Sequence, residues 1–414
     1  MRIAAPGSPH LSYCTNIHAG ESLAEVRAAI VDHVVKVKQA VSPDAPFGVG
    51  LRLSARASSE LTRGSALEAF RALLDAHGLY VFTLNGFPFG AFHGQKVREA
   101  VYRPDWLERE RVDYTDRLAS QLTALLPDGV SGSVSTVPGA FRPRVGIAPE
   151  ERARDEERIA RHLLAHAATL FQLREETGKL VELCLEPEPC CFLETTDETV
   201  RFFETRLFSR AAVLGFAERL GLGAPESEAF LRRHLGVCLD ACHLAVQFED
   251  AATAVGRLEA SGVRIGKVQV TCALAVVLSG DPNADRRVYG LLERFADDVY
   301  LHQVVERHAS GLVRHLDLPD ALAAARARGR IGPSEWRVHF HVPVFAEGLG
   351  ALGSTQPFLR DLLALAARRE LSPHFEVETY TWDVLPSEHR STDVNRAIAR
   401  ELEWTLGRFN ARAP

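Results

Sequence analysis

Short apolar runs alternate with longer amphipathic stretches from one end of the chain to the other. This alternation is typical of repeated βα units, in which surface helices connect buried parallel strands. Eight apolar runs predict strands at residues 12–17, 47–53, 80–84, 130–136, 180–185, 236–239, 265–270 and 375–379. Two further runs, at residues 299–305 and 336–342, also predict strands. We therefore expect an α/β protein.

The stretches between these runs predict helices, because their apolar residues recur at helical spacing. The predicted helices span residues 22–41, 108–126, 149–176, 196–220, 317–327 and 391–409. Ten strands are two more than a closed (β/α)8 barrel, or TIM barrel, contains. We expect one barrel domain over residues 1–414, with the extra strands in an insertion at residues 271–335. The alternative is that two of the strand predictions are wrong.

Composition supports a globular protein with a substantial core, since 46% of the 414 residues are hydrophobic and 25% are charged. A net charge of -6 disfavours a general nucleic-acid binder, although a local basic cleft is compatible with it. The seven cysteines form no paired CxxC motifs and predict reduced thiols in a cytoplasmic protein. No signal peptide or transmembrane segment is predicted.

Residues 236–243, GVCLDACH, carry two polar side chains at the exit of an apolar run. The run does not alternate with polar residues, as is usual for a strand buried on both faces of a parallel sheet. Asp240 would be the first carboxylate beyond it, and a buried carboxylate needs a metal, an arginine or backbone donors. Alternatively, Asp240 caps a following helix and His243 lies in its first turn. Similar side chains at other strand ends favour a functional site over the helix cap.

Polar side chains recur at the ends of several predicted strands, where the sites of α/β barrels are assembled. Glu186 follows VELCL, although it could simply begin a turn in LEPEP. His339 and His341 share one face of their strand, as metal ligands or as hydrogen-bonded core histidines. Glu376 and Glu378 also share a face, and Glu378 is preferred because it is nearer the strand exit. Further candidates, each with an ordinary structural explanation as the alternative, are His18, Asn85, His93, Gln269 and His302.

These carboxylates, imidazoles and amides are oxygen and nitrogen donors, which suit a divalent ion such as Mn²⁺, Mg²⁺ or Zn²⁺. The cysteines are not spaced for a structural zinc site. The chain has no GxxxxGK[ST] motif, no GxGxxG that follows a strand and opens a helix, and no GxSxG motif. We therefore expect a divalent metal and find no support for a nucleotide cofactor.

Three strand ends, VELCLE, GVCLDACH and EVET, resemble the xylose isomerase-like TIM-barrel superfamily, which includes sugar epimerases and apurinic endonucleases. The resemblance implies divalent metal held by residues after the fifth to eighth strands. By position these residues are Glu186, Asp240, Gln269 and Glu378. Gln269 is a poor metal ligand, and His341 competes for its place. The resemblance also implies that His243 contacts substrate, as in the epimerases, or metal, as in the endonucleases.

Longer segments spread over residues 13–386 resemble the EboE-type metabolite traffic proteins, a bacterial branch of this superfamily. These segments are YCTNIHAGES, TLNGFPFGAFHGQKVREAVYRPDW, CLEPEPCCFLET, GVCLDACHLAVQFE, VQVTCAL, WRVHFHVPVF and EVETYTWDVLP. The resemblance implies a functional link to a membrane UbiA-like prenyltransferase and to the movement of a secondary-metabolite precursor to the periplasm. It does not imply a defined reaction.

The favoured function is that of a metal-dependent isomerase or epimerase, or a related hydrolase, acting on a small polar metabolite. Glu186 and Glu378 would move a proton to and from carbon, and His243 would orient or assist. The residues expected to contact substrate are His18, Asn85, His93, His302, His339 and Trp382.

Two other functions are compatible with the sequence. One is a binding or carrier protein that retained the barrel without turnover, which the poor ligand Gln269 favours. Aromatic residues could then hold an apolar molecule or simply pack over the barrel mouth; they are Phe87, Phe89, Phe92, Tyr102 and Trp106. The other is an abasic-site endonuclease, which the acidic net charge disfavours, so no nucleic-acid partner is expected.

Overall fold

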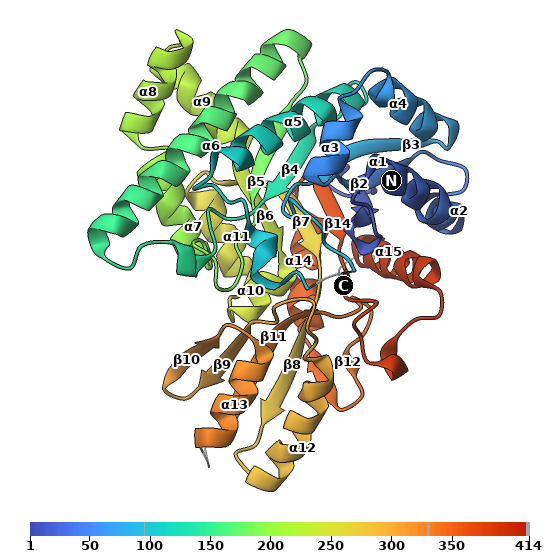
Figure 1. The fold of residues 1–414 in the computed structure, drawn as a ribbon, viewed down its shortest axis with the longest axis vertical. Helices are drawn as coiled ribbons and strands as arrows, with labels where there is room; N and C mark the ends of the chain where they lie inside the picture. The colour runs from blue at the N-terminus through green and yellow to red at the C-terminus, as the bar shows by residue number, and fades with distance from the viewer. Residues whose placement is uncertain (95, 329–331, 411–414) are drawn as a thin grey trace.

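The computed structural model describes residues 1–94, 96–328 and 332–410. Eight parallel strands form a barrel (Figure 1), in the order β1-β14-β7-β6-β5-β4-β3-β2. A parallel bridge between Cys14 and Gly50 joins the strands at the two ends of this order and closes the barrel. The strands are β1 (His10–Tyr13), β2 (Phe47–Arg52), β3 (Leu79–Asn85), β4 (Gly132–Thr136), β5 (Val181–Leu185), β6 (Leu235–Asp240), β7 (Arg264–Val270) and β14 (His374–Val377).

The eight barrel strands coincide, within a few residues, with the eight apolar runs that predict them, so the predicted (β/α)8 fold is confirmed. Every residue of β2, β4, β5, β6 and β14 is buried. Burial on both faces explains the continuous apolar runs of β2 and β6, whereas β4 and β14 alternate with buried polar side chains.

Helices surround the barrel and connect its strands (Figure 1). They are α1 (Leu23–Ala29), α2 (Val35–Val41), α3 (Ala55–Leu61), α4 (Ala66–Ala76), α5 (Arg109–Leu125), α6 (Pro149–Thr177), α7 (Thr196–Phe202), α8 (Arg210–Leu220), α9 (Ala224–His234), α10 (Ala241–Val246), α11 (Ala251–Ala260), α14 (Gln356–Arg368) and α15 (Val394–Asn410). None of the described helices is long and apolar enough to cross a membrane.

Two predicted helices are not continuous. Residues 22–41 contain a π-helical turn at Ile30–Val34 between α1 and α2. Residues 196–220 contain a second π-helical turn at Phe203–Leu207, and α8 then begins anew because the Ser209 side chain caps it. The sequence also did not predict several shorter helices, namely α3, α4, α9, α11 and α14, and α10 was anticipated only in the alternative that Asp240 caps a helix.

A second sheet lies between β7 and β14 in the sequence and has the order β10-β9-β11-β8-β13-β12. Its strands are β8 (Ala273–Leu278), β9 (Val304–His308), β10 (Gly311–His315), β11 (Ser334–His341), β12 (Gly348–Leu349) and β13 (Leu352–Ser354), and it carries α12 (Pro282–Leu292) and α13 (Leu318–Arg328). The two extra predicted strands overlap β9 and β11, but β9 starts at Val304 rather than at residue 299. The sheet continues past residue 335 to Ser354, and the division into one domain with an insertion at residues 271–335 stays a prediction.

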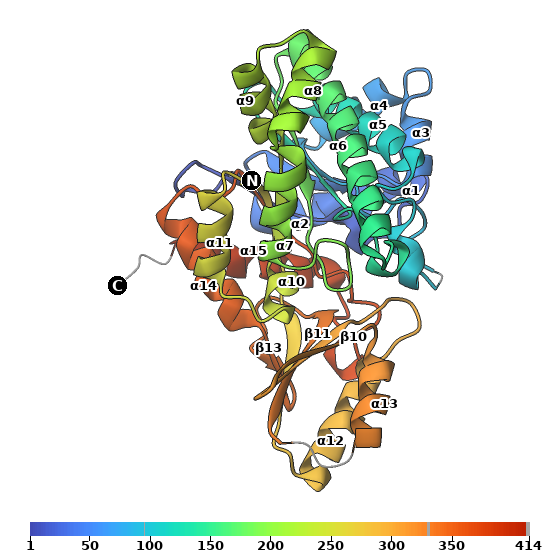
Figure 2. The ribbon, with the colours of Figure 1, turned by 90° about the vertical axis from the view of Figure 1, so that its left-hand side faces the viewer.

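The second sheet projects from the carboxyl ends of the barrel strands. Figures 1 and 2 both show it below the barrel, with α10 between the two. Strand β8 begins three residues after β7 ends, and β11 brings its last residues, His339 and His341, back to the barrel. The space between barrel and sheet is therefore lined from both sides.

Candidate metal centre

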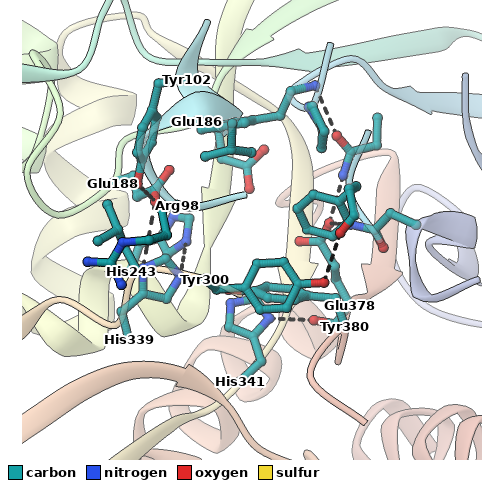
Figure 3. A pocket seen from close by; sticks show the side chains of 17 residues that line it. Arg98, Tyr102, Glu186, Glu188, His243, Tyr300, His339, His341, Glu378 and Tyr380 are labelled. Atoms are coloured by element: carbon teal, nitrogen blue, oxygen red, sulfur yellow. Dashed lines mark hydrogen bonds and ion pairs between the residues drawn. The ribbon is translucent and has the colours of Figure 1, made fainter. Parts of the chain in front are cut away.

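A pocket with about 560 Å³ of empty space lies at the carboxyl ends of the barrel strands (Figure 3). The barrel contributes Asn85, Glu186 and Glu378, and the chain between β7 and β14 contributes Tyr300 and further residues. The lining is Asn16, Asn85, Phe87, Pro88, Phe92, Arg98, Val101, Tyr102, Glu186, Glu188, His243, Tyr300, Leu301, His339, His341, Glu378 and Tyr380. Its polar lining residues converge from several strands and loops, as in small-molecule sites.

Three carboxylates from different strands meet at this end of the barrel, here called the pocket floor; Glu186 and Glu378 line the pocket, whereas Asp240 lies next to them and is not among its lining residues. Glu186 follows β5, Asp240 ends β6 and Glu378 follows β14, and each offers an oxygen within 4.8 Å of the others. All three side chains are buried, and Glu186 Oε2 and Asp240 Oδ2 have no hydrogen-bond partner. Burial, reinforced by repulsion from Asp240, raises the pKa of Glu186 well above its usual value. Burial and then Glu186 raise the pKa of Glu378 in the same way.

Two amides fix the carboxylate of Glu378. Asn16 Nδ2 and Asn85 Nδ2 both donate to Glu378 Oε1, at 2.6 and 2.7 Å. Asn85 Oδ1 in turn accepts from the backbone N–H of Phe87 at 3.0 Å, which fixes the orientation of its own amide. The described residues form no salt bridge with Glu378, and attraction to Lys267 only partly offsets the rise in its pKa.

Asp240 is also the N-cap of α10, so rejecting the helix-cap explanation was wrong. Its Oδ1 accepts from the backbone N–H of His243 at 3.0 Å and from Thr271 Oγ1 at 2.7 Å. The other oxygen, Oδ2, lies 3.8 Å from His243 Nε2 and accepts no hydrogen bond. A cap needs only one carboxylate oxygen, and the second oxygen remains available at the pocket floor.

Three buried imidazoles complete the polar part of the pocket. The Nδ1 atoms of His243 and His341 donate to the backbone carbonyls of Pro187 and Glu378, the first at 3.0 Å. His339 Nδ1 lies 2.7 Å from Gln303 Oε1. A carbonyl only accepts, so Nδ1 carries the proton in the first two rings and Nε2 keeps its lone pair when the ring is neutral. Burial lowers the pKa of all three histidines, which favours the neutral form.

The donor set fits a divalent cation. His341 Nε2 has no partner, and the Nε2 atoms of His243 and His339 lie 3.1 Å apart. Histidine ligands commonly donate their other ring N–H to a carbonyl in this way. Among the described residues, four groups offer ligand atoms within 4.8 Å of one another: Glu186–Asp240–Glu378, Asp240–His243–His341, Glu188–His243–His339 and Cys242–His339–His341. Carboxylate oxygens and imidazole nitrogens suit Zn²⁺ or Mn²⁺.

Gln269 does not line this pocket. It lies on β7 between Asp240 of β6 and Glu376 of β14 in the strand register. Its side chain is fully buried, and neither amide atom has a hydrogen-bond partner. Of the two residues that competed for the fourth ligand position, only His341 lies in the pocket wall, and its assignment as a ligand stays a prediction.

Two of the six predicted substrate-contact residues, Asn85 and His339, line the pocket. His18 and Trp382 line a separate groove, where the His18 ring stacks on His33 at 4.0 Å between ring centroids. His93 contacts the pocket indirectly, through a bond of 2.5 Å between its Nε2 and the carbonyl oxygen of Asn16.

His302 supports a pocket residue without lining the pocket itself. Its ring bridges Asp297 Oδ2 at 2.5 Å and the carbonyl oxygen of His339 at 3.0 Å. The structure therefore places it behind His339.

Sequence reasoning missed several pocket residues. Glu188 was not among the predicted site residues, yet it accepts from the Tyr102 hydroxyl at 2.7 Å, and burial raises its pKa to about 8. Asn16 is visible in the segment YCTNIHAGES, but nothing in that segment alone shows that it reaches the last strand. Tyr300 and Arg98 come from segments with no strand-end signal. Tyr300 belongs to the chain between β7 and β14, and Arg98 to the long loop between β3 and α5.

Glu376, the less preferred acid of the last strand, lies outside the pocket lining. Its Oε2 pairs with Lys267 Nζ at 2.5 Å, and both side chains are fully buried. Burial, the largest single effect, lowers the pKa of Lys267, but attraction to Glu376 together with Glu186 and nearby cysteines outweighs it and the pKa is raised. Lys267 thus stays charged and neutralises Glu376.

No protein-family model and no curated protein sequence matches the chain. Solved structures that resemble it are xylose isomerase-like barrel proteins. The probable 3-DHS dehydratase AsbF from Bacillus anthracis is 11% identical over 95% of this chain and 97% of that chain, with a TM-score of 0.47. A xylose isomerase domain protein from Alicyclobacillus acidocaldarius is 16% identical, with 97% and 100% covered and a TM-score of 0.42. The IolI protein with a bound zinc is 13% identical, with 97% and 100% covered and a TM-score of 0.45.

Proposed function

We propose that this protein is a divalent-metal-dependent enzyme with isomerase- or epimerase-like chemistry on a small polar metabolite. The observation that carries the proposal is the meeting of Glu186, Asp240 and Glu378, buried and without a cationic partner among the described side chains of the pocket floor. Three adjacent buried carboxylates repel one another unless they are protonated or share a cation.

A bound divalent cation would neutralise this cluster and polarise neighbouring substrate oxygens. Glu186 and Glu378 come from opposite parts of the strand order, since β5 and β14 are separated by β6 and β7. They can therefore face a substrate from two sides and exchange a proton with its carbon. Asn16 and Asn85 hold Glu378 in place, and His243, fixed by Pro187, can orient a substrate hydroxyl through Nε2.

The resemblance to EboE-type proteins supports a finer proposal, in which the metabolite is a precursor in bacterial secondary metabolism and a UbiA-like prenyltransferase acts in the same process. A carrier protein is the alternative within this setting. Turnover distinguishes the two, because a carrier binds the molecule without exchanging its carbon-bound hydrogens.

The test is hydrogen exchange in D₂O, with metal-loaded protein and a panel of ketoses and aldoses such as D-fructose and D-ribose. We expect deuterium at a carbon next to the carbonyl group of at least one sugar. The exchange should be lost in Glu378→Gln and in Glu186→Gln and kept in Glu347→Gln, an exposed control that pairs with Arg360. Binding of a sugar without exchange would overturn the enzyme proposal in favour of the carrier.

A further inference from the structure

The pocket lining is unevenly charged. Three of its side chains are glutamates, and Arg98 is the one Lys or Arg among the lining residues of the described chain. The carboxylates gather at the floor: Glu186 and Glu378 lie near Asp240, and Glu188 lies near His243 and His339. A metal explains the acids at the floor, whereas it does not explain an arginine in the wall.

The backbone around Arg98 is fixed by its conformation and by hydrogen bonds. Arg98 starts a 3-10 turn, Arg98–Tyr102, in the loop between β3 and α5, and it has a φ of 41°, which side-chain-bearing residues rarely adopt. The backbone N–H groups of Val97 and Arg98 both donate to the carbonyl oxygen of Val299, at 2.8 and 2.9 Å. In the view of Figure 3, Arg98 lies on the Glu188 and His243 side of the pocket, across from Glu378.

The guanidinium has spare hydrogen-bonding capacity. Its Nη2 pairs with Asp317 Oδ2 at 2.8 Å, and 37% of the Arg98 side chain is exposed against 4% of Asp317. Asp317 Oδ1 also accepts from the backbone N–H groups of His302 and Leu318, at 3.0 and 2.9 Å. Asp317 is thus held by the chain between β7 and β14, while Arg98 keeps most of its five N–H donors for another anion.

Aromatic rings form another part of the pocket wall. Phe92, Tyr300 and Tyr380 contact one another, with ring centroids 5.0 to 5.5 Å apart. The Tyr300 hydroxyl donates to the carbonyl oxygen of Phe92 at 3.0 Å, which ties the two segments together. A carbon skeleton suits this uncharged wall, whereas an anionic substituent there finds a partner only in Arg98.

We propose that the substrate is a small acid whose carboxylate or phosphate group pairs with Arg98 while its hydroxyl or carbonyl end lies at the carboxylate floor. This inference rests on the proposed function for the position of the reacting end. Arginine recognises both anions through the same fork of paired N–H groups, so the shared chemistry is a planar or tetrahedral oxyanion.

The experiment compares three probes with similar carbon skeletons: neutral D-ribose, D-ribose 5-phosphate and D-ribonate. Binding to the full-length, metal-loaded protein is measured by calorimetry at low salt. We expect at least one anionic probe to bind about 10- to 100-fold more tightly than ribose. The phosphate and carboxylate arms show which anion the wall accepts.

Variants assign the preference to Arg98. In Arg98→Gln the ratio of anionic to neutral affinity should fall to about one, and Arg98→Lys should keep part of it. Asp317→Asn removes the competing anion and should raise the affinity for the anionic probe. Lys96→Gln is the matched control, because Lys96 is two residues away, pairs with Asp298 and does not line the pocket.

Three outcomes would overturn the assignment: ribose binding as tightly as both anions, no binding of either anion at millimolar concentration, or a preference that survives Arg98→Gln. These outcomes are distinct from failure of the proposed function. A protein that binds no metal but still prefers the anionic probe through Arg98 would retain this inference and lose the enzyme.

Discussion

Two glutamates on the last barrel strand, Glu376 and Glu378, are two residues apart and face the same side, yet they have opposite partners. Glu376 is neutralised by Lys267, inside the barrel, at 2.5 Å. A Cβ atom at Gly50 of β2 would overlap the Glu376 carboxylate, so this glycine leaves room for the ion pair inside the barrel. Glu378 accepts only from two neutral amides and lies beside Glu186 and Asp240.

The difference distinguishes two layers of the barrel. The lower layer, inside the barrel, holds Glu376 and Lys267, and the upper layer, at the carboxyl ends of the strands, holds Glu186, Asp240 and Glu378. A buried carboxylate that is paired with a lysine has its charge neutralised within the fold. A buried cluster of three carboxylates without one is complete only when it gains protons or a cation from outside. The lower layer therefore needs no ligand, and we propose that the upper layer is a site.

The largest effect should follow from breaking the lower layer. Lys267→Met leaves Glu376 buried without a counter-charge and should lower the free energy of unfolding by about 3–5 kcal/mol. Urea denaturation measures this loss. The double variant Lys267→Met/Glu376→Gln should recover most of it, because no charge is then stranded. Equal losses in the single and double variants would show that the lysine matters for packing rather than for charge.

A third buried carboxylate, Glu401 of α15, extends the comparison to a group with neutral partners. It accepts from Thr379 Oγ1 at 2.6 Å and from the Val344 N–H at 3.1 Å, and burial raises its pKa from 4.5 to about 7. The folded state then holds a proton that the unfolded state has lost. Stability should thus be highest below pH 4.5 and should fall as the pH rises to about 7.

Glu401→Gln should remove this part of the pH dependence, which amounts to about 3 kcal/mol. The measurement is the free energy of unfolding of both proteins at pH 4.5 and pH 7, the two ends of the window. An unchanged difference between the two pH values would mean that Glu401 ionises alike in both states.

In the upper layer, the amides that hold Glu378 should tune the metal. Asn85→Ala removes one of the two donors to Glu378 Oε1 and should weaken divalent-metal binding about 10- to 100-fold, as loss of an outer partner of a ligand usually does. Competition with a chelator gives the affinity. Wild-type affinity in this variant would show that Glu378 is not a ligand.

The smallest effect should come from Trp382, which the sequence placed among the substrate contacts. The structure puts it in the groove beside His18, apart from the pocket. Trp382→Phe should change metal affinity less than about twofold, within 0.4 kcal/mol. A larger loss would mean that this groove and the metal centre are coupled.

The barrel was predictable from the sequence because its strands are buried and several of them, such as β2 and β6, are continuous apolar runs. The strand-end acids were predictable for the same reason, since Glu186, Asp240 and Glu378 each interrupt such a run or follow it directly. The dual role of Asp240 was not, because one carboxylate can cap a helix with one oxygen and leave the other free.

The second sheet and the wall of the pocket could largely not be predicted from the sequence. Strands β10, β12 and β13 are short, and every residue of β10 is at least partly exposed, so they lack the apolar signal of the barrel strands. Arg98, Tyr300 and Glu188 enter the pocket through long-range packing that local spacing does not encode. Lys267 was overlooked because its partner is on a strand more than a hundred residues away.

The most direct test of the two-layer account is the metal content of purified protein loaded with Mn²⁺ or Zn²⁺, measured by elemental analysis after removal of excess ion. Asp240→Asn is the test variant, because asparagine still caps α10 but carries no charge. The account predicts about one bound ion or more in the wild type and in Lys267→Met/Glu376→Gln, and little or none in Asp240→Asn. A wild-type protein that stays metal-free, or an Asp240→Asn variant that binds metal as the wild type does, would contradict it.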